Sequence, residues 1–320
     1  MERHEFLKRF ASFLLSLWLK PIPGTAGPRQ ESPGDSSVPY RRLGRTGVKV
    51  SILGPGGFHI GRMLSEKEAI RLVHHAIEAG INFFDTAESY QRGGSEIRLG
   101  KALQGRRDNV FLMTKTYDPA GRDAEGARRH LEASLRRLRT DYLDLWQLHS
   151  IQSPEDVDRA FRPGGAMEYL MKARGEGKVR FIGVTGHRDP QAHLRALYYW
   201  DQGWKFDTLQ MPLNPIDYHQ KSFTRRVLPE AVKRGIGVIA MKTSADGRLL
   251  REKLCTIDQC LNYVWTLPIG VAVVGMTSLK ELKHNVELAR RFKPMPEAEK
   301  SALLSSLAPK ARMELEWYKR

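Results

Sequence analysis

The segment Leu143-Asp144-Leu145-Trp146-Gln147-Leu148-His149 gives the clearest indication of the fold. It is short, mostly apolar and ended by a polar residue, which is typical of a strand buried on both faces of a parallel sheet. Seven similar runs occur along the chain. They cover residues 50–53, 82–85, 110–114, 181–184, 208–211, 238–241 and 271–274.

Segments with helical periodicity separate these runs. The first begins at the capping sequence Ser65-Glu66-Lys67-Glu68 and stops at Gly80. The others cover residues 95–103, 124–138, 166–175, 191–199, 223–234, 257–267 and 279–291. About eight strand–helix units of roughly thirty residues each predict an α/β protein, a single-domain (β/α)8 TIM barrel.

An open, doubly wound sheet is the alternative architecture. It usually has fewer strands and begins with a G-x-G-x-x-G turn that binds phosphate. The run Gly-Pro-Gly-Gly-Phe-His-Ile-Gly at residues 54–61 lacks that spacing and contains a proline. We expect its glycines to let a ligand approach the end of the first strand, with Phe58 and His59 as walls of a substrate pocket.

The chain is strongly basic, with a formal net charge of +16 over 320 residues. The basic residues lie mostly along amphipathic helices, and no nucleic-acid-binding motif accompanies them. We therefore expect a solvated outer ring of helices and no nucleic-acid partner. The two cysteines, Cys255 and Cys260, match neither a redox nor a zinc-ligand spacing, so we expect buried thiols and no metal.

Residues 1–39 differ in composition from the rest of the chain. A basic start and an apolar run at 10–19 predict a signal-like or anchor segment at 1–27, followed by a disordered linker at 28–39 and the barrel at 40–320. The apolar run is too short for a stable membrane span. His4 stands where a twin-arginine export motif has its second arginine, so export and a cytoplasmic location both stay open.

Three of the predicted strands end in polar residues that can act together. Asp85, Lys115 and His149 follow the second, third and fourth strands, and Tyr90 lies on the loop after Asp85. In a closed barrel these strand ends meet at the C-terminal face, where active sites lie. A lysine cation held by a buried aspartate lowers the pKa of a neighbouring tyrosine, and a histidine can polarise a carbonyl. This set predicts a site that gives a proton to oxygen while a hydride reaches carbon.

Several ordered motifs resemble those of the aldo-keto reductase superfamily. They are residues 84–90 (Phe-Asp-Thr-Ala-Glu-Ser-Tyr), 95–103, 113–115 and 141–149, and the opening stretch 40–47 resembles the N-terminal β-hairpin of that family. The resemblance implies that Tyr90 is the general acid/base, that Lys115 and Asp85 tune it, and that His149 orients the carbonyl. It also implies a hydride from a nicotinamide cofactor bound across the barrel mouth without a Rossmann domain.

The cofactor positions of that family match in part. Gln210 matches, whereas Thr185-Gly186-His187 replaces Ser-Asn and Met241-Lys242 replaces the usual pair on the seventh strand, as in a bacterial branch of the superfamily. The resemblance assigns the adenosine phosphate to Gly275, Thr277, Ser278 and Asn285. Glu281 stands where many members have an arginine for the 2′-phosphate. The usual cofactor preference of the family favours NADP(H), and NAD(H) remains open.

The function expected from these features is NAD(P)H-dependent reduction of aldehydes or ketones to alcohols, or the reverse. The alternative is a nucleotide-binding regulatory subunit with little turnover. His187 is a candidate for substrate contact or for packing at the rim. The identity of the small carbonyl or alcohol substrate and the oligomeric state do not follow from the sequence.

Overall fold

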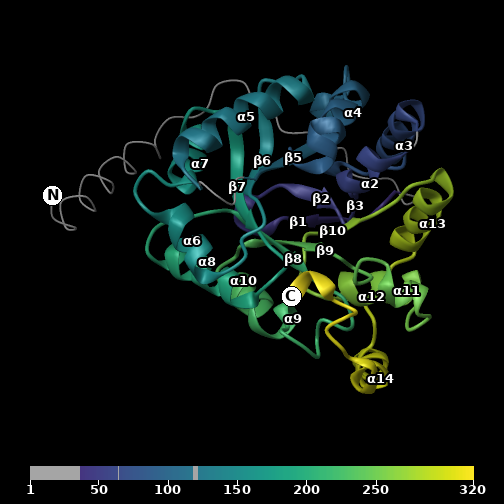
Figure 1. Ribbon diagram of the computed structural model, residues 1–320. Helices are drawn as coiled ribbons and strands as arrows, with labels where there is room; N and C mark the ends of the chain where they lie inside the picture. The colour runs from purple at the N-terminus through teal and green to yellow at the C-terminus, as the bar shows by residue number, and fades with distance from the viewer. Residues whose placement is uncertain (1–36, 64, 118–121) are drawn as a thin grey trace.

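The structure is a computed structural model that describes residues 37–63, 65–117 and 122–320. Eight parallel strands form one sheet in the order β3-β10-β9-β8-β7-β6-β5-β4, which confirms the predicted barrel (Figure 1). A parallel bridge between Gly56 and Asp85 joins the two ends of this sheet. The strands are β3 (Leu53–Pro55), β4 (Phe83–Asp85), β5 (Phe111–Thr116), β6 (Leu143–Leu148), β7 (Val179–Thr185), β8 (Thr208–Pro212), β9 (Gly237–Met241) and β10 (Val271–Val274). The predicted signal-like segment at 1–27 lies outside the described residues.

The N-terminal hairpin is also confirmed. It pairs β1 (Tyr40–Arg42) with β2 (Lys49–Ser51) in antiparallel register. The prediction of one strand over residues 50–53 was wrong, because Val50 and Ser51 belong to the hairpin and the barrel strand begins at Leu53. The amide of Ser51 donates to the Asn82 side chain, and the chain bends at Ile52. An apolar run that crosses such a bend contains no signal for it.

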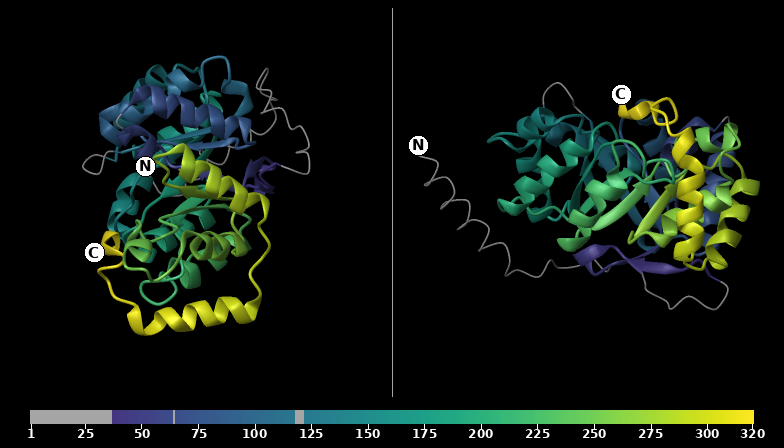
Figure 2. Two further views of the ribbon diagram at one scale, coloured as in Figure 1. Left: turned by 90° about the vertical axis from the view of Figure 1, so that its right-hand side faces the viewer. Right: turned by 90° about the horizontal axis from the view of Figure 1, so that it is seen from below.

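The hairpin closes one end of the barrel. Leu43 packs so closely on Gly237 and Gly270, at the starts of the last two strands, that a Cβ on either glycine would lie within 3.0 Å of it. The interior above it is apolar, with Phe83, Phe111 and Phe181 in a row of stacked rings. Figure 2 shows the purple hairpin at one end of the molecule and the C-terminus toward the other. The C-terminal ends of the strands are therefore the open end.

Helices cover the outside of the barrel, and their apolar faces form a second core layer against the strands (Figure 1). The predicted helices correspond to α3 (Glu66–Glu78), α4 (Gly94–Ala102), α5 (Ala124–Leu138), α7 (Ala166–Gly175), α8 (Pro190–Asp201), α9 (Phe223–Arg226), α10 (Leu228–Lys233), α12 (Ile257–Thr266) and α13 (Leu279–Arg290). The helix expected over 223–234 is divided at Val227, and a new helix begins at Leu228 with Pro229 in its first turn, where proline fits. Both cysteines are buried free thiols.

Four further α-helices in the described part of the chain were not predicted: α2 (Gly57–Arg62), α6 (Pro154–Phe161), α11 (Arg248–Arg251) and α14 (Glu297–Leu307). The glycine-rich run at 54–61 thus continues from β3 into α2. A Cβ on Gly57 would lie 2.2 Å from the carbonyl oxygen of Asp85. Gly57 therefore lets α2 approach β4, and the expectation that the glycines let a ligand approach the first strand stays a prediction. Within the described ranges, no helix is long and apolar enough to cross a bilayer.

Candidate active site

The open end of the barrel brings together Asp85, Tyr90 and Lys115. Lys115 lies on β5 with 1% of its side chain exposed, and its ammonium forms an ion pair with the Asp85 carboxylate at the end of β4. The same ammonium donates to the carbonyl oxygen of Thr86 at 2.8 Å and lies 3.4 Å from the Tyr90 hydroxyl. Three acceptors thus fix the lysine, and one of them is the phenol.

The electrostatics of this group differ in one respect from the prediction. Burial raises the pKa of Tyr90 above its usual value, while the Lys115 cation acts in the opposite direction without cancelling it. Burial also disfavours the charge on Lys115, but Asp85 and Tyr90 outweigh it and leave the pKa of the lysine raised. The expected net lowering of the tyrosine pKa was wrong for this state of the protein. The Tyr90 phenol is therefore neutral at pH 7 and lies beside a fixed cation.

His149 completes the predicted set. It follows β6, and its ring centroid lies 5.8 Å from that of Tyr90 in an edge-on arrangement. Burial, with Lys115 nearby, lowers the pKa of His149 well below its usual value, so the imidazole is neutral at pH 7. Its Nδ1 is enclosed and has no hydrogen-bond partner in the part of the chain that the structure describes. A neutral histidine can donate a hydrogen bond to a carbonyl oxygen without giving up its proton.

Arg122 holds the backbone at His149. Its Nη1 donates to the His149 carbonyl at 2.7 Å, and its Nη2 donates to that of Ser150 at 2.9 Å. The other side of the guanidinium binds the Asp156 carboxylate through Nε at 3.0 Å and Nη2 at 2.8 Å. Both partners of this ion pair are almost completely buried. Arg122 was missed from the sequence because no motif or periodicity marks it.

Two exposed aromatic rings flank the cluster. Phe58 meets Tyr90 edge-on at 5.4 Å between centroids, and Tyr117 meets His149 at the same distance. Phe58 is 41% exposed and Tyr117 is 36% exposed, which is unusual for rings of this size. Phe58 and Tyr117 thus lie against Tyr90 and His149, and the expectation that Phe58 lines a substrate pocket stays a prediction.

Comparison with known proteins agrees with this geometry. The aldo/keto reductase family profile matches residues 52–262. L-galactose dehydrogenase of Arabidopsis thaliana is 33% identical over 233 residues, which cover 68% of this chain and 69% of that protein. The chain belongs to the aldo-keto reductase family. Its class is therefore that of an oxidoreductase, as the motifs indicated.

Solved structures of the family share the fold. Aldo-keto reductase AKR11C1 from Bacillus halodurans, in its holo form, matches with a TM-score of 0.70 and 25% identity, covering 84% of this chain and 96% of that one. An aldo-keto reductase from Klebsiella pneumoniae, solved with NADPH, matches with a TM-score of 0.70 and 24% identity over 86% of this chain and 97% of that one.

The positions matched to the cofactor site of the aldo-keto reductases lie on the neighbouring strands. Thr185 ends β7 and Gln210 lies on β8, in direct register with each other, and both are 1% exposed. The Gln210 Oε1 is buried and has no hydrogen-bond partner among the described residues. Such a group is costly to leave unpaired, so it fits a ligand that brings an amide donor. Met241 ends β9, and the following Lys242 pairs with Asp246 at 2.8 Å.

The predicted phosphate stretch follows β10 and begins α13. A Cβ on Gly275 would lie 2.3 Å from the His59 ring, so His59 covers this glycine rather than lining an open pocket. Ser278 caps α13 by accepting from the Glu281 amide at 3.2 Å. Glu281 in turn accepts from the Thr277 amide at 2.7 Å and from the Thr277 hydroxyl at 3.1 Å. The Glu281 carboxylate therefore accepts from the amide and the hydroxyl of Thr277, two donors that were expected to bind a phosphate. Asn285 is buried on the same helix.

A C-terminal segment lies over the rim of the mouth. The backbone carbonyl of Tyr318 lies 3.2 Å from the Nδ1 of His187, which places His187 in packing contact with this segment. The next residue, Lys319, is fully buried and forms ion pairs of 2.6 Å with Asp217 and with Glu316. The exposed Trp317 donates to Asp246 at 3.1 Å. This buried triad of Lys319, Asp217 and Glu316 fixes the segment, and no feature of the sequence predicted it.

Proposed function

We propose that this chain is an NAD(P)H-dependent reductase of aldehydes or ketones that uses Tyr90 as its general acid. The observation that carries the proposal is the neutral Tyr90 hydroxyl beside the fixed Lys115 cation, with neutral His149 next to it at the open end of the barrel. A bound nicotinamide supplies the hydride. The residues of the chain supply the proton and the electrostatic stabilisation.

In the reduction direction, the substrate carbonyl oxygen lies between Tyr90 and His149. His149 donates a hydrogen bond that polarises the C=O bond. As hydride reaches the carbon, the Tyr90 O–H bond breaks and its proton goes to the oxygen, which leaves an alcohol and a phenolate. The Lys115 cation stabilises that phenolate, and Asp85 keeps the lysine charged and in place. Alcohol oxidation uses the same groups in reverse.

The unpaired Gln210 Oε1 supports the cofactor assignment, because a nicotinamide carboxamide has the N–H donors it lacks. Thr185 beside it offers a hydroxyl at the same level of the barrel. The adenosine end of the cofactor would be held by Gly275, Thr277, Ser278 and Asn285. Met241 and Lys242 would lie between this end and the nicotinamide. The NADPH complex of the Klebsiella pneumoniae protein is consistent with this class of cofactor.

The test is a fluorescence titration of the purified chain with NADPH and with NADH, followed by a screen of aldehydes and ketones. We expect saturable binding of at least one nucleotide and turnover of at least one carbonyl compound. Binding with negligible turnover would favour the regulatory alternative. Failure of both nucleotides to bind would refute the proposal.

A further inference from the structure

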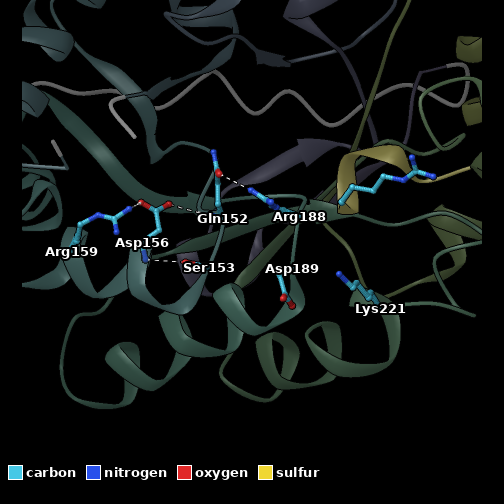
Figure 3. A pocket seen from close by; sticks show the side chains of 8 residues that line it. Gln152, Ser153, Asp156, Arg159, Arg188, Asp189 and Lys221 are labelled. Atoms are coloured by element: carbon cyan, nitrogen blue, oxygen red, sulfur yellow. Dashed lines mark hydrogen bonds and ion pairs between the residues drawn. The ribbon is translucent and has the colours of Figure 1, made fainter. Parts of the chain in front are cut away.

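A cationic cavity of about 440 Å³ lies beside the loops that follow β6, β7 and β8 (Figure 3). Its charged lining residues come from α6, from the loop before α8, from the loop before α9 and from the C-terminal segment. They are Asp156, Arg159, Arg188, Asp189, Lys221 and Arg320. The volume suits a small organic ligand. Nothing in the proposed hydride transfer uses these residues.

The two carboxylates of the cavity are already occupied. Asp156 accepts from buried Arg122 behind the wall and from Arg159 at 3.0 Å. Asp189 caps α8 by accepting from the Gln191 amide at 2.9 Å. Asp156 is therefore paired, whereas Asp189 keeps its charge, and with four cations against two carboxylates the lining carries a net charge of +2.

Two cations of the cavity, Arg188 and Lys221, donate to neutral acceptors. Arg188 donates to the neutral Gln152 Oε1 at 3.1 Å, and Lys221 donates to the backbone carbonyl of Lys319 at 3.3 Å. Within residues 37–63, 65–117 and 122–320, neither Arg188 nor Lys221 forms an ion pair. Figure 3 shows both side chains at the cavity. Cations that face one cavity repel one another, and a bound anion removes that repulsion.

The surroundings add positive potential to the cavity and fix the position of Lys221. The helices α6 and α8 both begin at the cavity, after Ser153 and Asp189, so the positive ends of two helix dipoles add to the field. Lys319 is anchored by its buried triad, and its carbonyl fixes Lys221. An arginine fork and a lysine in one cavity suit a tetrahedral anion with several acceptor oxygens.

We propose that this cavity binds the phosphate group of a small phosphomonoester. The group belongs either to a phosphorylated carbonyl substrate or to a separate effector. The proposal does not depend on the reductase reaction, because it concerns binding that is measurable without turnover.

The test is calorimetric titration of the full chain with inorganic phosphate at low ionic strength. We expect saturable binding that the double variant Arg188→Gln/Lys221→Gln weakens at least tenfold. The control Arg71→Gln/Lys233→Gln removes two exposed cations from α3 and α10 and should leave phosphate affinity within about twofold. No saturable binding, equal weakening in the control, or loss of binding on adding NADPH would overturn the proposal.

A second measurement separates the two sources of phosphate. KM values for glyceraldehyde 3-phosphate and for glyceraldehyde are compared in the wild type and in the Arg188/Lys221 double variant. A rise in KM of tenfold or more for the phosphorylated aldehyde alone assigns the phosphate to a substrate. Unchanged KM values together with phosphate binding assign it to an effector.

Discussion

Arg122 donates a 2.7 Å hydrogen bond to the backbone carbonyl of His149 and so connects the imidazole to a buried ion pair. We expect Arg122→Met to lower the free energy of unfolding by about 3–5 kcal/mol, because it leaves the Asp156 carboxylate buried without its main partner. Urea denaturation measures this loss. Arg122→Lys should retain the charge but reduce kcat more than it changes KM, because a lysine cannot hold both carbonyls and the carboxylate.

Arg159 provides the control for that prediction. It binds the same Asp156 carboxylate from the surface, where 44% of its side chain is exposed. Arg159→Gln should cost less than about 1 kcal/mol. Equal costs for the two arginines would show that the buried pair does not hold the strand end.

Tyr90→Phe should reduce turnover on the order of 100- to 10,000-fold, because it removes the proposed proton donor while retaining the ring. Nucleotide affinity should stay close to that of the wild type. Tyr117→Phe is the matched control, since its ring also packs on His149 but its hydroxyl has no proposed role. Steady-state kinetics and fluorescence titration check both. Substantial turnover by Tyr90→Phe would assign the proton to another group.

Glu281→Arg should increase the affinity for NADPH relative to NADH by about tenfold or more, because it replaces an anion at the start of α13 with a donor for the 2′-phosphate. The exposed Glu287 on the same helix gives a control, Glu287→Arg, with the same change of charge. Dissociation constants for both nucleotides are compared. An equal ratio in both variants would place the 2′-phosphate elsewhere.

Acid should destabilise the protein through its buried histidines. Burial lowers the pKa of His193 to about 4, whereas an unfolded histidine has a pKa near 6.5. Below pH 6.5 His193 binds a proton in the unfolded state but stays neutral in the folded state. The folded state therefore loses stability relative to the unfolded state as the pH falls from 6.5 toward 4. This residue alone should lower the free energy of unfolding by about 2 kcal/mol between pH 7 and pH 5.

His193→Gln tests that prediction. Glutamine can still donate to the Gln210 carbonyl, which lies 3.2 Å from the His193 Nε2, but it does not titrate. Urea denaturation at pH 7 and pH 5 should show a smaller difference in this variant than in the wild type. An unchanged difference would mean that other groups control the acid sensitivity.

The four predicted catalytic positions followed from the sequence because each lies at or just after a strand end, and the strand ends of a barrel meet at one face. The strand register contributes too, because Lys115 on β5 pairs with Gln147 on β6, two residues before His149, which directly follows β6. The bend at Ile52 and the helix α6 were not predictable in this way. An apolar run does not show where it turns, and α6 is a short helix in a segment expected to be a loop.

Contacts between residues that are distant in the sequence were also not predictable. Arg122 and His149 are separated by 27 positions, and Asp217 and Lys319 by 102. Neither pair has a periodicity or motif that joins them. The direction of the Tyr90 pKa depended on how deeply the phenol is enclosed, and residue types alone do not fix that depth.

The triad of Lys319, Asp217 and Glu316 restricts how this sequence can change over time. Loss of Lys319 leaves two carboxylates in the interior without their cation, at a cost of several kcal/mol that few domains tolerate. Apolar replacement of all three is thermodynamically acceptable, but an intermediate that loses the lysine before the carboxylates is not. A lineage that carries this triad is therefore expected to keep Lys319 for as long as a carboxylate stays buried beside it, and with it the arrangement of the C-terminal segment over the barrel mouth.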